Sequence, residues 1–153
     1  GVTAWSSATV PFFITSNPFI ARAYARCVRG LLRDLAGRGE LVPGEKIYVV
    51  ELGAGSGKFG FLLAQALQAA MAARRGGAVA GVRASDVVVV LTDFAESNVG
   101  AWEAMPGLRA LADEGVVDFA TLDAGSDAEV RLRRSGVVLR AAGDDGGGGG
   151  GGG

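Results

Sequence analysis

Histidine is absent from the 153 residues of this chain, and cysteine occurs once, at Cys27. Without histidine the chain cannot contain a Ser-His-Asp triad, a Cys-His pair or a His-based zinc site. A single cysteine likewise excludes an internal disulfide framework and Cys-rich zinc or iron–sulfur sites, so we predict no metal centre. One thiol in a chain of this size fits an intracellular, reducing compartment, either the cytoplasm or an organelle.

Long apolar runs and a strong net charge are also missing. No run approaches the roughly 20 residues of a membrane-spanning helix, so we expect no membrane segment. The net charge of −1 provides no bulk attraction to nucleic acid. Hydrophobic residues make up 49% and charged residues 20%, which is typical of a folded globular chain. The final residues are all glycine, and we expect 143–153 to be a low-complexity tail.

An amphipathic helix is predicted within the N-terminal segment, residues 1–40. Asn17 can cap it and Pro18 suits its first position, while Gly37 ends it. Its apolar stripe comprises Ile20, Ala23, Cys27, Leu31 and Leu35, and it is widened by Tyr24, Val28 and Leu32. Its polar side carries Arg22, Arg26, Arg29 and Arg33. These arginines form either a solvated face or a contact surface for an acidic partner.

Strand-like and helix-like segments alternate through residues 41–142. The apolar, β-branched runs 46–51, 87–92 and 116–121 predict buried strands. The segments 58–75, 95–105 and 108–114 have helical character, and a further strand is expected at 137–140. This order predicts an α/β fold with right-handed crossovers and a parallel sheet with helices on both faces. Three strands would supply the N-terminal, cofactor-binding half of a Rossmann-like, doubly wound sheet, preceded by the amphipathic helix.

A glycine-rich turn, residues 51–57, joins the first strand to the next helix. Glycines there permit positive φ and let a ligand approach the backbone at the helix start. A phosphate-binding P-loop is excluded, because Leu52 replaces its first glycine and Phe59 its metal-binding hydroxyl. A dinucleotide fingerprint can be aligned on Gly55, Gly57 and Gly60. The next strand-end acid then falls 33 residues after Gly60, where about 20 are expected.

The turn also resembles another motif, the first motif of Rossmann-like S-adenosylmethionine-dependent methyltransferases. That motif is an apolar strand ending in an acid, here Glu51, followed by alternating glycines before a helix. The resemblance covers roughly residues 46–124. It implies that Asp93, at the end of the second strand, binds the ribose hydroxyls, and that Asp123, after the third, meets the adenine amine. The implied cofactor-binding residues are Glu51, Gly53, Ala54, Gly55, Gly57, Asp93, Phe94, Asp123 and Ala124.

These residue types suit S-adenosylmethionine. One carboxylate can accept hydrogen bonds from two adjacent hydroxyls, and such charge-assisted bonds are stronger than neutral ones. The acid Glu51 can favour the cationic end of the ligand. The ligand carries no phosphate, which agrees with the lack of a phosphate-clamping side chain in the turn.

A second resemblance concerns the residues that precede the turn. The stretch 12–32 is similar to the N-terminal segment of the MidA-like methyltransferases, which are linked to arginine methylation and mitochondrial complex I assembly. That family tends to have proline and arginine in the turn, where this chain has Ala54 and Ser56.

The resemblances together imply an S-adenosylmethionine-dependent methyltransferase, or the cofactor-binding fragment of one. The methyl acceptor is unidentified, with a protein as one possibility, and no catalytic residue can be named. Two alternatives stay open: a non-catalytic Rossmann-like module that binds a partner, and an NAD(P)-binding domain.

Overall fold

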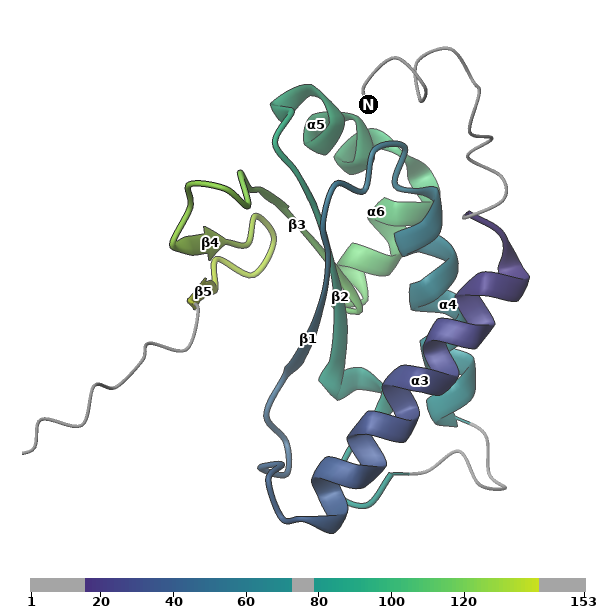
Figure 1. The fold of residues 1–153 in the computed structure, drawn as a ribbon. Coiled ribbons are helices and arrows are strands. Elements are labelled where there is room, and N and C mark those ends of the chain that lie inside the picture. The colour runs from purple at the N-terminus through teal and green to yellow at the C-terminus, as the bar shows by residue number, and fades with distance from the viewer. Residues whose placement is uncertain (1–15, 73–78, 141–153) are drawn as a thin grey trace, which may run out of the picture.

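The computed structural model of the chain describes residues 16–72 and 79–140 (Figure 1). The N-terminal residues 1–15, the end of the helix predicted at 58–75 and the predicted tail 143–153 lie outside these ranges. The helices are α3 (Pro18–Gly37), α4 (Lys58–Ala72), α5 (Glu96–Ala104) and α6 (Pro106–Asp113), with a short 3₁₀ helix at Ala84–Asp86. The strands are β1 (Ile47–Glu51), β2 (Val87–Asp93), β3 (Val117–Thr121), β4 (Glu129–Arg131) and β5 (Val138–Arg140). No helix in the described ranges has the length and hydropathy to cross a bilayer.

The amphipathic helix α3 begins where the sequence predicted. The Asn17 side chain accepts hydrogen bonds of 3.0 Å from the backbone amides of Phe19 and Ile20. Its packed face includes Leu32 of the predicted apolar face but is rotated toward Ala21 and Ala25, small residues that allow α3 to approach α4 closely. Ala21, Ala25 and Leu32 are buried there, whereas Cys27 is exposed. The prediction that Cys27 lies on the packed apolar face is therefore wrong.

The central sheet is parallel, in the order β1-β2-β3, as predicted. Its middle strand, β2, is buried along all seven residues, because neighbours pair with both edges and layers cover both faces. Alternate side chains point to opposite faces. Val87, Val89 and Leu91 join the core beneath the helices, while Val88 and Val90 face the other side.

All helices of the described ranges lie on one face of the sheet, not on both (Figure 1). The two crossovers step in the same direction along the sheet, and right-handed crossovers of that kind place their helices on the same side. The opposite face is partly covered by the antiparallel hairpin β4–β5, whose Leu132 packs on Val88, Val90 and Ala120. The predicted strand at 137–140 thus exists, but it belongs to a separate two-stranded sheet.

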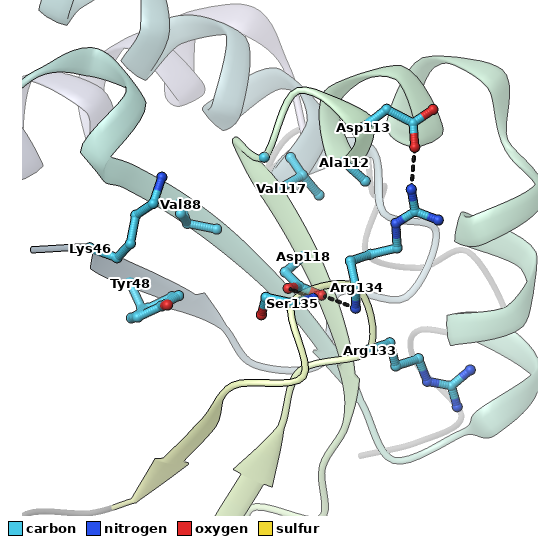
Figure 2. A pocket seen from close by; sticks show the side chains of 11 residues that line it. Lys46, Tyr48, Val88, Ala112, Asp113, Val117, Asp118, Arg133, Arg134 and Ser135 are labelled. Carbon is cyan, nitrogen blue, oxygen red and sulfur yellow. Dashed lines mark hydrogen bonds and ion pairs between the residues drawn. The ribbon is translucent and has the colours of Figure 1, made fainter.

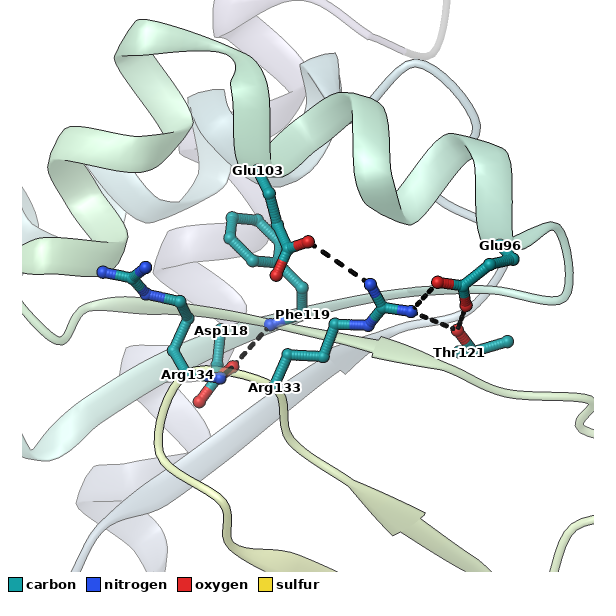
Figure 3. Close-up of polar contacts among 7 residues, drawn as sticks. All are labelled: Glu96, Glu103, Asp118, Phe119, Thr121, Arg133 and Arg134. Carbon is teal, nitrogen blue, oxygen red and sulfur yellow. Dashed lines mark hydrogen bonds and ion pairs between the residues drawn. The ribbon is translucent and has the colours of Figure 1, made fainter.

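The hairpin is attached to β3 by polar contacts (Figure 3). The Arg133 amide donates to the Phe119 carbonyl at 2.8 Å, and the Asp118 carboxylate accepts from the Arg134 and Ser135 amides at 2.9 and 3.0 Å. The Arg133 guanidinium reaches α5, where it pairs with Glu96 and with Glu103. Its hydrogen bond to Glu96 raises the pKa of Arg133 and lowers that of Glu96. The outer edge of β3 is therefore held against the hairpin.

Candidate functional site

The glycine-rich turn lies where β1 ends and α4 begins, at the carboxyl edge of the parallel sheet. Its three alternating glycines all have positive φ: 66° at Gly53, 53° at Gly55 and 71° at Gly57. Side chains with a Cβ rarely adopt this backbone conformation. The path of the turn therefore requires the glycines that the sequence singled out.

The underside of the turn is fixed by the end of β2 and by α5. The Ala54 amide donates to the Thr92 carbonyl at 2.9 Å, and the Gly55 amide donates to Asp93 Oδ2 at 3.0 Å. Trp102 Nε1 donates to the Gly55 carbonyl at 2.9 Å. A Cβ on Gly57 would lie 2.9 Å from the Trp102 ring. The turn is thus held in one conformation by contacts from below.

The upper side of the turn is open. A Cβ built on Gly53 would meet no heavy atom within 4 Å, and one on Gly55 would reach only the Gly53 carbonyl, at 4.0 Å. Two large apolar side chains next to these strand ends in the sequence are exposed: Leu52, which follows β1, with 63% and Phe94, which follows β2, with 79% of its surface accessible. A large exposed aromatic ring beside an open backbone turn is a suitable surface for a planar ligand.

The Glu51 carboxylate is partly buried behind the turn. Its Oε2 atom has no hydrogen-bond partner among the described residues and lies 2.5 Å from where a Cβ on Gly60 would stand. Desolvation by burial raises the pKa of Glu51 from 4.5 to about 7, and the Gly60 backbone amide opposes the rise. Glu51 is therefore a group whose charge changes near neutral pH.

Asp93 lies beside the turn, as the sequence led us to expect, but its carboxylate is occupied. Besides Gly55, it accepts hydrogen bonds from the Ala95 amide at 2.9 Å and from Asn98 Nδ2 at 3.1 Å. Burial alone would raise the pKa of Asp93, but these hydrogen bonds outweigh it and lower the pKa. Three of the roughly four acceptor positions of the carboxylate are used within the protein. Asp93 is thus chiefly a support for the turn.

Asp123 and Ala124 follow β3 at the same edge of the sheet. The two strand ends are joined by a hydrogen bond of 3.0 Å from the Leu122 amide to the Asp93 carbonyl. The Asp123 carboxylate, however, accepts from the Gly125 amide at 2.9 Å, within its own loop. Ala124 is exposed and lines a cavity of about 240 Å³ together with Val50 and Leu122. The structure brings the turn and Asp93 together, and it binds the Asp123 carboxylate within its own loop.

Two residues that support the turn were missed from the sequence. Trp102 and Asn98 both lie on α5, more than 40 residues after the turn. The one indication in the sequence is that tryptophan carries a hydrogen-bond donor that needs a partner when the ring is buried. Nothing in the spacing of these residues identifies Gly55 or Asp93 as the partner.

A second hollow, of about 440 Å³, lies on the hairpin side of the sheet (Figure 2). Tyr48 and Val88 line it from the sheet, and Lys46 and the Arg134–Asp113 ion pair border it. Lys46 donates to the Ser85 carbonyl at 2.6 Å, and the Asp118 carboxylate is held by backbone amides. The charged groups around this hollow are already paired within the protein, so the hollow is a weaker candidate for a ligand site than the turn.

Comparison with known proteins gives no further assignment. No family model, no curated protein and no solved structure matches the chain. The case for a function therefore depends on the residues of the turn and its surroundings.

Proposed function

We propose that the chain is the cofactor-binding part of an S-adenosylmethionine-dependent methyltransferase with a Rossmann-like fold. The observation that carries the proposal is the turn between β1 and α4, whose three glycines have positive φ and whose upper side is open. Ligands of open α/β sheets bind at this edge, outside the carboxyl ends of the strands. The chain offers a backbone surface there without a cationic clamp, which suits a ligand that lacks phosphate.

The neighbouring side chains fit the chemical groups of this cofactor. We assign stacking on adenine to the exposed Phe94 ring, and the unpartnered Oε2 of Glu51, when the carboxyl is ionised, would provide negative charge behind the turn. The Asp93 carboxylate fixes the Gly55 amide and so holds the backbone that would receive the ligand.

The bound cofactor supplies an electrophilic methyl group on a sulfonium. The contribution of these residues is to bind and orient it, so that an acceptor can approach in line. Such positioning requires no histidine. The acceptor and any general base are not assigned to residues of this chain.

Titration calorimetry of the 153-residue chain with S-adenosylhomocysteine tests the proposal, with NAD⁺ and ATP as comparison ligands. We expect saturable heat with S-adenosylhomocysteine and none with the two phosphate-bearing ligands. A folded sample, verified by circular dichroism, that gives no heat with S-adenosylhomocysteine contradicts the proposal. Preferential binding of NAD⁺ would identify a dinucleotide site in its place.

A variant pair locates the site. Phe94→Ala should weaken S-adenosylhomocysteine binding by about 5- to 150-fold, since stacking on an aromatic ring contributes about 1–3 kcal/mol per base. Phe19→Ala is the matched control, because Phe19 is also an exposed phenylalanine, at 67%, but lies on α3 away from the turn. Equal affinities for both variants would remove Phe94 from the site.

One observation favours a second candidate, a non-catalytic α/β module. The carboxylates of Asp93 and Asp123 both accept hydrogen bonds from their own protein, as acids with a purely structural role do. This candidate predicts that the folded chain binds none of the three ligands. It also predicts that Phe94→Ala changes neither ligand binding nor stability.

A further inference from the structure

A groove between α3 and α4 lies away from the glycine turn. It encloses about 520 Å³, and its lining residues come from two helices: Pro18, Arg22, Ala25 and Arg26 from α3, and Leu62, Gln65, Ala66, Ala69 and Ala70 from α4. Four of these nine residues are alanine; of those on α4, Ala66 and Ala70 are half-buried and Ala69 is exposed. Small side chains in a groove between two helices allow the backbone of a third helix to approach closely.

One wall of this groove is cationic. Arg22 and Arg26 line it, and the half-buried Arg29 follows on the same side of α3, because the three residues are spaced by four and three. Within the described ranges, none of these three arginines forms an ion pair. On the other wall, α4 (Lys58–Ala72) contains no acidic residue at all. The groove thus combines an apolar floor with positive charge that no described neighbour neutralises.

We infer that this groove is a docking site for an acidic amphipathic helix of a partner protein. The apolar face of such a helix would lie on Ala66, Ala69 and Ala70, and its carboxylates would pair with the arginines of α3. A helix in a groove is a common form of peptide recognition, with anchors repeating every three to four residues. The groove is concave, with a volume of about 520 Å³, so it fits a helix better than the flat surface of a bilayer. The chain's net charge of −1 disfavours binding to nucleic acid. The inference does not depend on the proposed cofactor.

A charge-swap experiment tests this inference. The probe is a fluorescein-labelled helical peptide with Ala and Leu on one face and Glu at the spacing of the three arginines, and a second peptide has Lys in place of Glu. By fluorescence anisotropy, we expect the full chain to bind the Glu peptide with micromolar affinity and the Lys peptide much more weakly. The double variant Arg22→Glu/Arg26→Glu should lose about tenfold in affinity for the Glu peptide and gain affinity for the Lys peptide.

Two further variants distinguish docking in the groove from the effect of changing any exposed arginine. Arg109→Glu is the matched control, because Arg109 is an exposed helical arginine on α6, and it should leave binding unchanged. Ala69→Trp places a ring on the groove floor from an exposed position, and it should abolish binding of the Glu peptide while the fold, monitored by circular dichroism, is kept.

Three results would overturn the inference. One is no binding of the Glu peptide up to about 1 mM. Another is equal loss of binding in Arg109→Glu and in the double variant. The third is that duplex DNA or anionic vesicles bind through Arg22 and Arg26 while the Glu peptide does not.

Discussion

The ends of β2 and β3 make an informative comparison, because each carries an aspartate followed by a loop at the same edge of one sheet. Asp93 reaches across to the neighbouring loop and holds the Gly55 amide at 3.0 Å, with only 4% of its surface exposed. Asp123 is exposed and binds the Gly125 amide of its own loop. The two residues occupy matching places in the sequence pattern. Their difference shows that a strand-end acid can either build a site or merely close a turn.

The largest effect is expected where the turn meets α5. Gly57→Ala would place a Cβ 2.9 Å from the Trp102 ring at a φ of 71°. Overpacking and a left-handed backbone each cost about 1–3 kcal/mol, so we expect a loss of roughly 3 kcal/mol in the free energy of unfolding. Gly53→Ala meets no neighbouring atom and should cost only the strain, about 1–2 kcal/mol. Urea denaturation measures both, and equal losses would contradict this account of the turn.

The next largest effect is expected for variants of Asp93, which test its role directly. Asp93→Ala removes the acceptor for Gly55, Ala95 and Asn98 and should cost about 2–3 kcal/mol in the free energy of unfolding. Asp93→Asn keeps one carbonyl oxygen in place and should lose less. The measurement is again urea denaturation. A loss below about 0.5 kcal/mol for Asp93→Ala would show that Asp93 does not support the turn.

The pH dependence of stability should reveal Glu51. Burial raises its pKa to about 7 in the folded chain, so between pH 4.5 and about 7 the unfolded chain releases a proton that the folded chain retains. Its contribution to stability is therefore complete below pH 4.5 and declines as the pH rises to about 7, by at most about 1.4 kcal/mol per pH unit. Glu51→Gln should flatten this decline in thermal unfolding curves recorded across that range. A decline that is as steep in the variant as in the parent chain would assign it to other groups.

The smallest effect is expected at the end of β3. Asp123→Ala removes hydrogen bonding only within an exposed loop and should change the free energy of unfolding by less than about 0.5 kcal/mol. The same variant should leave S-adenosylhomocysteine affinity unchanged unless the carboxylate leaves Gly125 to meet a ligand. A large loss of affinity would therefore restore Asp123 to the site and remove the contrast with Asp93.

The sequence was sufficient for the main elements of the fold and for the position of the turn. β-branched runs placed β1, β2 and β3 to within a residue, and the three glycines were identified as a turn that requires positive φ. The two helices predicted at 95–105 and 108–114 are separate, as α5 and α6, but α6 begins two residues earlier than predicted, at Pro106, because proline is well tolerated at a first helical position. The strand β4 was missed because its residues, Glu129 to Arg131, are largely charged and pair only with β5.

The hydrogen bonding of Asp93 and the raised pKa of Glu51 could not be derived from the sequence. Whether Asp93 is free or occupied depends on α5, which brings Asn98 and the Ala95 amide to the carboxylate. The rise in the pKa of Glu51 likewise depends on how closely Gly60 allows α4 to approach β1. Both are properties of tertiary packing, which no local pattern records.

Within residues 16–72 and 79–140, β1 has a neighbouring strand on one side only, while the rim of β3 is occupied by the hairpin. Backbone donors and acceptors along its other side form a ready template for a strand from another molecule. Val50 of β1, which is 42% exposed, adds apolar surface on the hairpin side of the same strand. Self-association of this chain at high concentration should therefore begin at β1, and a lysine at position 50 should delay it.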